Sequence, residues 1–405
     1  MHILIIEGFR PAHEILKEMG IEITLLIEEF RISGNEKGFY DRYFTVSNNA
    51  VLDEWLQQVD KINEISRIDK VINFHENRQY ETAIISRHLG IEYYNVRETR
   101  ICKDKLLMRS FLNETGIDSV LSGKLEHIGD YLSSGKIKFP LIIKPYNGWA
   151  SKNIFKVTNE IELNTVCNTC KNDNEYKVYC FEKYIDGEEF SVETFSQFGM
   201  HKVIAVTKKF KNNNFVETGH CIPANLEYTR FNCIKDKVIE FLCGINHMNG
   251  PMHTEIIITK DQKVHIVESH LRMGGDNIPD LIKIVSDFDL LTIWCKQICD
   301  GNINLESVPE ITTNNMNGFV TIRYFMSEDK MIGCVVKEIN RGFFHKISNI
   351  VEYKFFVDIG DTILSNKDSF SRLGYVIVKG KTYEETNQLA DWIVHQSIIE
   401  VENNN

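Results

Sequence analysis

Two acidic residues in neighbouring segments of the chain could together bind a divalent metal ion. The segments MHTEIIIT and KVHIVESHLR are joined by a short polar turn at Asp261 and Gln262. If these two residues form the tip of a β-hairpin, Glu255 lies opposite Glu268, and the histidine two residues before Glu255 lies opposite His270. Because side chains alternate along a strand, all four share one face.

This carboxylate pair needs a positive charge nearby. Two carboxylates about 5 Å apart repel by roughly 3 kcal/mol at an effective dielectric constant near 20. Oxygen ligands completed by phosphates are what Mg²⁺ prefers, and Mn²⁺ takes similar sites, whereas an imidazole-dominated site would suit zinc. We therefore predict a divalent cation between Glu255 and Glu268. A solvated hairpin face is the alternative, and a three-residue turn would shift the register.

A candidate phosphate-binding element follows the apolar strand FPLII. Lys144 and Pro145 end this strand, and a loop of small residues, 147–152, comes next. A lysine at the end of a buried strand is costly unless it meets an anion, and a glycine in the loop lets backbone N–H groups approach phosphate. A lysine that reaches solvent is the common alternative. The P-loop spacing G-x-x-x-x-G-K-[ST] is absent.

Composition excludes several classes of protein. The 405 residues suffice for two or three domains, and 43% hydrophobic with 25% charged residues is typical of a globular protein. A net charge of -11 argues against a broad nucleic-acid surface. Among ten cysteines, Cys167 and Cys170 come nearest to a metal-type pair but have no matching second pair. Since no apolar run approaches the length of a spanning helix, we expect a cytoplasmic protein.

The chain reads as an α/β (α+β) protein of three domains. Strands at 3–7, 21–27 and 71–74, with a helix at 11–19, predict an open α/β domain over 1–100. No G-x-G-x-x-G follows the first strand, so dinucleotide binding is not expected. A helix at 103–115, then alternating strands and glycine turns, defines a second domain, 101–302. A strand-rich stretch at 318–378 and a helix at 382–395 predict a third, 303–405.

The order of these pieces resembles the ATP-grasp superfamily. Lys105, Lys144 with its glycine loop, the segment FEKYI, Glu255, and Glu268 with Arg272 follow one another as in that family. The resemblance covers most of the chain. It implies an ATP-grasp fold with an α/β domain before it and a small β-rich lid domain after it, and ATP with Mg²⁺ (or Mn²⁺) as cofactors.

The resemblance also implies how the nucleotide is held. The two lysines would contact the α and β phosphates under a flexible loop over 148–152. The hinge E-x-x-[IVL], here Glu182 to Ile185, would sandwich adenine, and Glu189 would hold the ribose. The nucleotide-binding set implied is Lys105, Lys144, Gly148, Ser151, Lys152, Glu182, Lys183, Tyr184, Ile185, Glu189 and His220.

The stretch ESHLRMGGD resembles the biotin-carboxylase-like branch, particularly bacterial L-amino acid ligases. There the metal carboxylates correspond to Glu255 and Glu268. His270 stands where many members have a metal-binding Asn, so it is either a metal ligand, a phosphate donor or a structural histidine. Asp276 would lie in the substrate pocket, and GFVTIRYF resembles the lid-bearing domain. The catalytic residues implied are Arg272, Lys144 and Arg323.

The function implied is that of an ATP-dependent carboxylate–amine ligase. A small carboxylate would become an acyl phosphate, and an amine would displace phosphate to give an amide or peptide bond. Partners would be amino acids or related amino compounds, without nucleic acid or membrane, and a homodimer is left open. The alternatives are a carboxylase that makes carboxyphosphate and a non-catalytic nucleotide-binding module.

Overall fold

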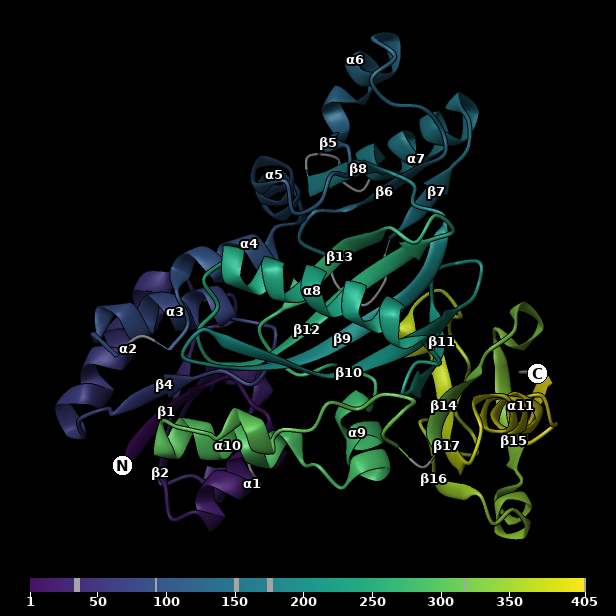
Figure 1. Cartoon of the computed structure of the whole chain (residues 1–405). Coiled ribbons are helices and arrows are strands. Elements are labelled where there is room, and N and C mark those ends of the chain that lie inside the picture. The colour runs from purple at the N-terminus through teal and green to yellow at the C-terminus, as the bar shows by residue number, and fades with distance from the viewer. Residues whose placement is uncertain (33–36, 92, 149–152, 173–177, 317, 404–405) are drawn as a thin grey trace.

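The computed structural model describes residues 1–32, 37–91, 93–148, 153–172, 178–316 and 318–403. Figure 1 shows an N-terminal region in purple and blue at one corner, a small β-sheet region with helices α5 to α7 at the top, and a C-terminal region in yellow. A large twisted sheet lies between them (Figure 1). The described residues include no helix long and apolar enough to cross a membrane.

The N-terminal region is an open parallel sheet in the order β3-β2-β1-β4. Its strands carry continuous apolar runs because helices cover both faces: Ile3 and Ile5 point into one core, and Leu4 and Ile6 into another that contains Trp55. The elements are β1 (His2–Ile6), α1 (Arg10–Glu18), β2 (Glu22–Glu28), β3 (Arg42–Val46), α2 (Leu52–Ile65), β4 (Lys70–Ile72), α3 (Gln79–His88) and α4 (Val96–Lys103).

A small antiparallel sheet, ordered β5-β8-β6-β7, follows helix α5 (Lys105–Thr115). Asp104 begins α5 by accepting hydrogen bonds from the backbone N–H groups of Leu106 and Leu107, which matches the predicted helix at 103–115. The remaining elements are β5 (Ser122–Lys124), α6 (Ile128–Ser133), β6 (Leu141–Pro145), β7 (Phe155–Val157), α7 (Glu160–Asn172) and β8 (Tyr179–Lys183).

The central sheet has eight strands in the order β13-β12-β9-β10-β11-β14-β17-β16. Helix α8 lies on one face, and α9 and α10 on the other (Figure 1). The elements are β9 (Gly187–Gln197), β10 (Met200–Lys211), β11 (Glu217–Ile222), α8 (Tyr228–Gly244), β12 (Gly250–Thr259), β13 (Val264–His270), α9 (Ile278–Ser286), α10 (Leu290–Asp300), β14 (Phe319–Met326), β16 (Ile350–Phe355) and β17 (Arg372–Gly380).

The C-terminal region continues this sheet. Strand β11 pairs with β14 across the predicted boundary at residue 303, and β14 pairs in turn with β17. Helix α11 (Tyr383–Val394) matches the predicted helix at 382–395, and a separate two-stranded sheet is formed by β15 (Cys334–Ile339) and β18 (Ile399–Asn403). The division at residues 100 and 302 stays a prediction, although the last segment shares its sheet with the segment before it.

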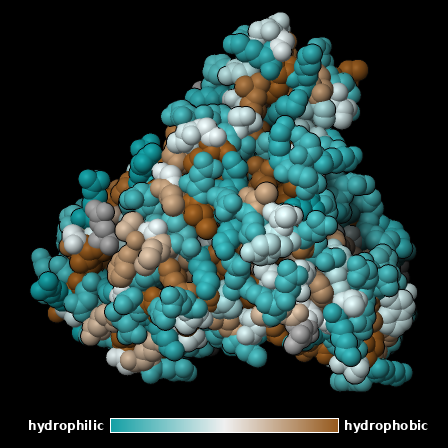
Figure 2. Space-filling view, in the orientation of Figure 1, coloured by the Kyte–Doolittle hydropathy of each residue, from teal (hydrophilic) through white to brown (hydrophobic). Residues whose placement is uncertain are grey.

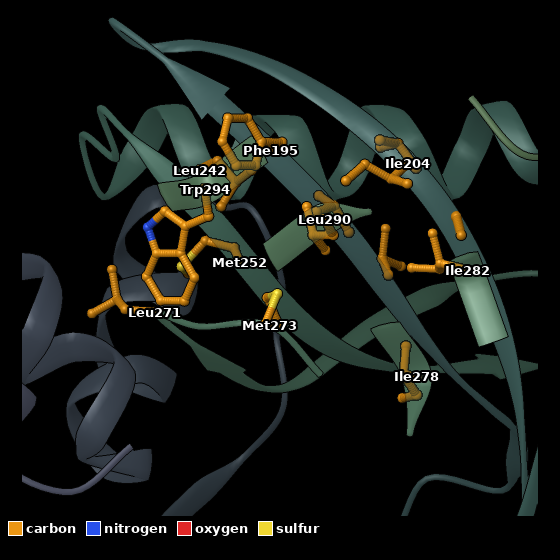
Figure 3. Packing of buried hydrophobic residues seen from close by; sticks show 14 of the residues in the cluster. Phe195, Ile204, Leu242, Met252, Leu271, Met273, Ile278, Ile282, Leu290 and Trp294 are labelled. Atoms are coloured by element: carbon orange, nitrogen blue, oxygen red, sulfur yellow. The ribbon is translucent and has the colours of Figure 1, made fainter. Parts of the chain in front are cut away.

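The main core joins the N-terminal region to the central sheet. Figure 3 shows Trp294 of α10 beside Met252 of β12 and Leu271, with Phe195 of β9 close by. The Trp294 ring lies 4.7 Å, centroid to centroid, from that of Phe74, which follows β4. The outer face in Figure 2 is mostly hydrophilic, with hydrophobic residues scattered over it.

Replacing Trp294 by Phe is expected to lower the free energy of unfolding by about 2 kcal/mol. Trp294 is fully buried, and its indole N–H donates to the Tyr93 hydroxyl at 3.1 Å, so the smaller ring loses packing and a hydrogen bond. Urea titration of both proteins measures the change. The matched control is Trp392→Phe on α11, where the ring is half exposed and the change should stay within about 0.5 kcal/mol. Equal effects at the two positions would contradict the prediction.

Candidate active site

One cavity of about 410 Å³ receives side chains from every part of the fold. Lysines come from α5, from the small sheet and from β10, carboxylates from the β12–β13 hairpin, and further charged residues from the N-terminal loop after β4 and from β17. The polar residues that line it include Glu76, Lys105, Lys144, Lys209, Glu217, His220, His253, Glu255, Glu268, His270, Arg272, Asp276 and Arg372. Charged groups of both signs therefore meet in one place.

The predicted carboxylate pair is confirmed, since Glu255 lies opposite Glu268 and His253 opposite His270. The predicted two-residue turn is wrong. Nearer the tip the pairing is shifted by one residue, with residue 256 opposite 266, and the backbone of Thr259 pairs with that of Lys263 around a three-residue turn. A β-bulge in β13, which inserts residue 267, corrects this shift before the strands reach the two glutamates.

A lysine neutralises each carboxylate of the pair. Lys209 on β10 bonds to Glu255 at 2.5 Å, and Lys105 on α5 bonds to Glu268 at 2.8 Å. Burial by itself would raise the pKa of both glutamates, but these lysines hold both pKa values well below the usual range. The positive charge expected beside the pair is thus present as two ammonium groups.

The donor set fits a divalent cation with a preference for oxygen. Glu255 and Glu268 share one wall of the cavity, and the ion pairs described for Glu255 with Lys209 and His253 both use its Oε1 atom. Two anionic carboxylates beside a space that could admit phosphates are the ligands that Mg²⁺ takes in nucleotide sites.

Two histidines stand behind the carboxylates, with ring centroids 5.9 Å apart and nearly parallel. His253 bonds through Nδ1 to Glu193 at 2.6 Å, and burial lowers its pKa less than Glu193 and Glu255 raise it, to about 9. His270 lies 3.4 Å from an oxygen of Glu268 on one side and of Glu76 on the other. In this structure His270 is an ion-pair partner of the carboxylates, and a metal-binding role for it stays a prediction.

Lys144 lies at the end of β6, as the strand-end pattern predicts, and lines the cavity. Its ammonium bonds to Glu182 at 2.9 Å, and Arg109 bonds to the same carboxylate at 3.1 Å. Burial would raise the pKa of Glu182, but Arg109 and Lys144 lower it to about 2. The Glu182 side chain therefore positions Lys144, and the expected contact of the hinge segment with adenine stays a prediction.

The other predicted nucleotide residues are only partly brought to the cavity. Lys105 and Gly148 line it, and the Lys105 ammonium donates to the Gly148 carbonyl at 2.9 Å. Lys183, Tyr184 and Ile185 join β8 to β9 outside the lining, and Glu189 forms an ion pair with Lys211. Ser151 and Lys152 lie outside the described residues.

Weakening the hold on Lys144 should weaken nucleotide binding. Glu182→Gln is expected to raise the dissociation constant of Mg-ADP about tenfold, because the Lys144 ammonium loses the charge that fixes its position. Titration calorimetry with Mg-ADP measures this without any turnover. The control is Glu188→Gln, which breaks a half-exposed ion pair with Lys208 away from the cavity and should leave the constant unchanged. Unaltered binding by Glu182→Gln would reject the role.

Arg272 and Asp276 both line the cavity, and the roles expected of them, with the transferred phosphate and in the substrate pocket, stay predictions. Glu76 holds the Arg272 guanidinium at 2.5 Å, while Asp276 accepts two bonds from Arg372 at 2.8 and 2.9 Å. His220 lies 3.3 Å from Asp276. Both guanidinium groups are thus held in place by carboxylates beside the space a substrate would occupy.

Three of these groups could themselves hold a cation. Glu217, His220 and Asp276 have ligand atoms within 4.8 Å of one another. Arg372 already pairs with both carboxylates, and Lys209 bonds to Glu217 at 2.5 Å. Fixed cations thus pair with these carboxylates, just as Lys105 and Lys209 pair with Glu268 and Glu255, so the ion pairs do not distinguish the two candidate metal sites.

The prediction that Arg323 points toward the substrate is wrong. Its guanidinium bonds to Asp391 at 2.6 Å and to Asn387 at 2.8 Å, both on α11. Because side chains alternate along β14, the next residue, Tyr324, faces the other side, where its hydroxyl donates to the Asp276 carbonyl. The arginine that β17 contributes to the cavity is Arg372.

The sequence interpretation missed Glu76, Lys209, Glu217 and Arg372. A weak signal existed for Lys209, since lysines at 209 and 211 would share one face if this segment were a strand. Glu76 follows a strand end of the open sheet, a common place for functional residues. No local pattern distinguishes Arg372 from Arg323 without the strand pairing.

Comparison with known proteins places this geometry in a family. Residues 137–280 match the family described as the ATP-grasp domain. The chain contains an ATP-grasp domain. Residues 342–402 match L-amino acid ligase C-terminal domain 2, so the resemblance seen in the sequence is confirmed for both segments.

Individual relatives point in the same direction. The alanine–anticapsin ligase of Bacillus subtilis (strain 168) is 25% identical over 277 residues, which cover 63% of this chain and 59% of that protein. The chain thus spans less than two thirds of the length of this relative. A D-alanine–D-alanine ligase of Bacillus anthracis (strain A0248) is 32% identical over 148 residues, or 34% of this chain and 47% of that protein.

Solved structures agree on the fold. The crystal structure of an L-amino acid ligase from Bacillus licheniformis matches with a TM-score of 0.82 and 18% identity, covering 100% of this chain and 99% of that one. The expected ATP-grasp fold, with an α/β region before it and a strand-rich region after it, is therefore confirmed.

Proposed function

We propose that this ATP-grasp protein is an ATP-dependent carboxylate–amine ligase acting on amino acids or related small amino compounds. The observation that carries the proposal is the facing pair Glu255 and Glu268, in one cavity with Lys105, Lys144 and Arg272. The matching C-terminal segment and the ligases among the relatives support the same activity.

The first step is transfer of the γ-phosphoryl group of ATP to the carboxylate of the acid. A carboxylate is a poor electrophile, and phosphorylation turns one of its oxygens into a good leaving group. Two anions must meet for this step, so fixed positive charge is the main requirement. Lys105 and Lys144 would hold the phosphates, and Arg272 would hold the transferring group and the acid. Their carboxylate partners keep these cations in place before the substrate arrives.

A divalent cation on Glu255 and Glu268 would neutralise the phosphate oxygens and orient the γ-phosphoryl group. Lys105 and Lys209 now pair with these carboxylates. With a divalent cation held by the two glutamates, these ammonium groups would be free to contact the phosphates. The amine then attacks the acyl phosphate carbon, and an amide, ADP and phosphate result.

A screen of amino acid pairs tests the proposal. Each pair is incubated with Mg-ATP, phosphate release is measured, and the condensed product is identified by its mass. The expected result is phosphate release that needs both partners and matches the amount of amide formed. Phosphate release stimulated by bicarbonate alone would instead favour the carboxylase alternative. ADP binding without turnover by any pair would favour a non-catalytic module.

A further inference from the structure

Helix α5 carries two buried cations one turn apart. Lys105 begins the helix, lines the active-site cavity and bonds to Glu268. Arg109, four residues later, lies on the same side of the helix and is 1% exposed. Asp118, which follows the end of α5, is buried as well. Arg109 and Asp118 are not among the described residues that line the cavity, so any part they play there acts through other residues.

Arg109 and Asp118 together bind both backbone groups of Ile266 on β13. The Ile266 N–H donates to Asp118 at 2.9 Å, and the Ile266 carbonyl accepts from Arg109. Because β13 is an edge strand of the central sheet, one side of its backbone has no neighbouring strand. Ile266 is fully buried, and buried backbone groups without a partner are costly. The two side chains therefore take the place of a further strand at this residue.

Ile266 is the last residue before the β-bulge in β13. Ile256 lies opposite Ile266 on one side of the bulge, and Glu255 lies opposite Glu268 on the other. Val267 and Glu268 are neighbours in the chain, yet both line the cavity, while the Ile266 side chain packs into the main core. Since side chains alternate along a regular strand, a shift of one residue would turn Glu268 away from the cavity. Holding the Ile266 backbone thus fixes the direction in which Glu268 points.

The same guanidinium reaches the lysine that would hold phosphate. Arg109 donates to both oxygens of Glu182, at 3.1 and 3.2 Å, and Glu182 bonds to the Lys144 ammonium at 2.9 Å. Glu182 and Lys144 belong to the small sheet, on β8 and β6. One planar side chain on α5 therefore connects the edge of the central sheet, beside the metal carboxylates, with the strand that carries Lys144.

The charges of this network compensate one another. Burial by itself would raise the pKa of Asp118, but a contact with His265 at 2.9 Å, the Ile266 N–H and the charge of Arg109 hold it below its usual range. Burial would likewise lower the pKa of Arg109, whereas Glu182 and Asp118 raise it. Removing one of these charges would leave its partner buried without compensation.

We propose that Arg109 and Asp118 are positioning residues for both halves of the metal and phosphate site. Together they fix the bulge in β13 and so the direction of Glu268. Arg109 also fixes Lys144 through Glu182. The inference rests on the proposed function, in which Glu268 holds a divalent cation and Lys144 holds phosphate, and it is the same whichever acid and amine react.

Two variants separate the halves of the proposal. Arg109→Lys keeps the charge but cannot make all of the guanidinium contacts, so the dissociation constants of ADP at saturating Mg²⁺ and of Mn²⁺ at saturating ADP should both rise about tenfold. Asp118→Asn disturbs only the β13 side. It should raise the Mn²⁺ constant about tenfold and the ADP constant less than about threefold. Titration calorimetry measures ADP, and electron paramagnetic resonance of free Mn²⁺ measures the metal. Without any ligand, backbone hydrogen exchange over residues 264–270 should be faster in both variants.

The matched control is Glu98→Gln, which breaks an equally buried pair with His247, 2.9 Å away, outside the cavity lining. It should lower the thermal unfolding midpoint as the other variants do and leave both dissociation constants unchanged. Unaltered Mn²⁺ binding by Asp118→Asn overturns the proposal, as does equal weakening by Glu98→Gln, and Asp118→Asn decides alone if Arg109→Lys does not fold. Because no turnover is measured, the expected shifts without any amide product would reject the ligase function and leave the positioning role standing.

Discussion

Glu268→Gln is expected to lower the rate of ATP turnover by about 10³-fold with the best acid and amine. The amide keeps the size of the carboxylate but loses its charge, so the pair with Glu255 can no longer neutralise a divalent cation. Lys105, which now bonds to Glu268 at 2.8 Å, would also lose its partner. Steady-state phosphate release with increasing Mn²⁺ measures both the rate and the metal concentration needed.

The control for Glu268→Gln is Glu240→Gln on α8, where the carboxylate is exposed and remote from the cavity. This variant should turn over ATP as the unaltered protein does. The thermal unfolding midpoint of each variant separates lost chemistry from lost folding. If Glu268→Gln turned over ATP at the unaltered rate, the assignment of the metal ligands would be wrong.

Arg272→Lys is expected to lower kcat by about 10²-fold, whereas Arg323→Lys should change it less than about threefold. Arg272 presents a planar guanidinium to the cavity, and a lysine cannot replace two parallel hydrogen bonds to a phosphoryl group or a carboxylate. Arg323 instead bonds to Asp391 and Asn387 under α11. Its replacement should lower the unfolding midpoint while leaving the chemistry intact.

The two arginine variants make a matched pair, since the same substitution is made at Arg272, just after β13, and at Arg323, within β14. Initial rates of phosphate release at saturating substrates measure kcat for both. A large loss of kcat in Arg323→Lys with little loss in Arg272→Lys would contradict the orientation of β14 in which Arg323 points to α11 and away from the cavity.

The hairpin shows how far the sequence could predict the site. The pairing of Glu255 with Glu268 was predicted correctly from a two-residue turn that does not exist. A three-residue turn and a bulge at residue 267 each shift the register by one, and the shifts cancel at the glutamates. Alternating residue types reveal which side chains share a face, but turn length and bulges depend on backbone geometry that the residue types do not determine.

Residues that act across the fold were harder to predict. Glu182 matched a family hinge, and its side chain bonds to Lys144 on β6 and to Arg109 on α5, contacts that depend on the pairing of β6 with β8 and on the position of α5. Lys209 on β10 reaches Glu255 on β12 across β9, the strand that lies between them. No local pattern in the sequence predicts such a strand order. The opening β-α-β unit and the helix at 382–395, by contrast, depend on local periodicity and were predicted correctly.

The most direct test of the central claim is a crystal structure of the protein with ADP and Mn²⁺, in which anomalous scattering locates the metal. The account predicts a manganese ion about 2.1 Å from carboxylate oxygens of both Glu255 and Glu268 and from phosphate oxygens of the nucleotide. Lys105 and Lys144 should then contact the phosphates. A metal bound elsewhere, or a nucleotide outside this cavity, would contradict the account.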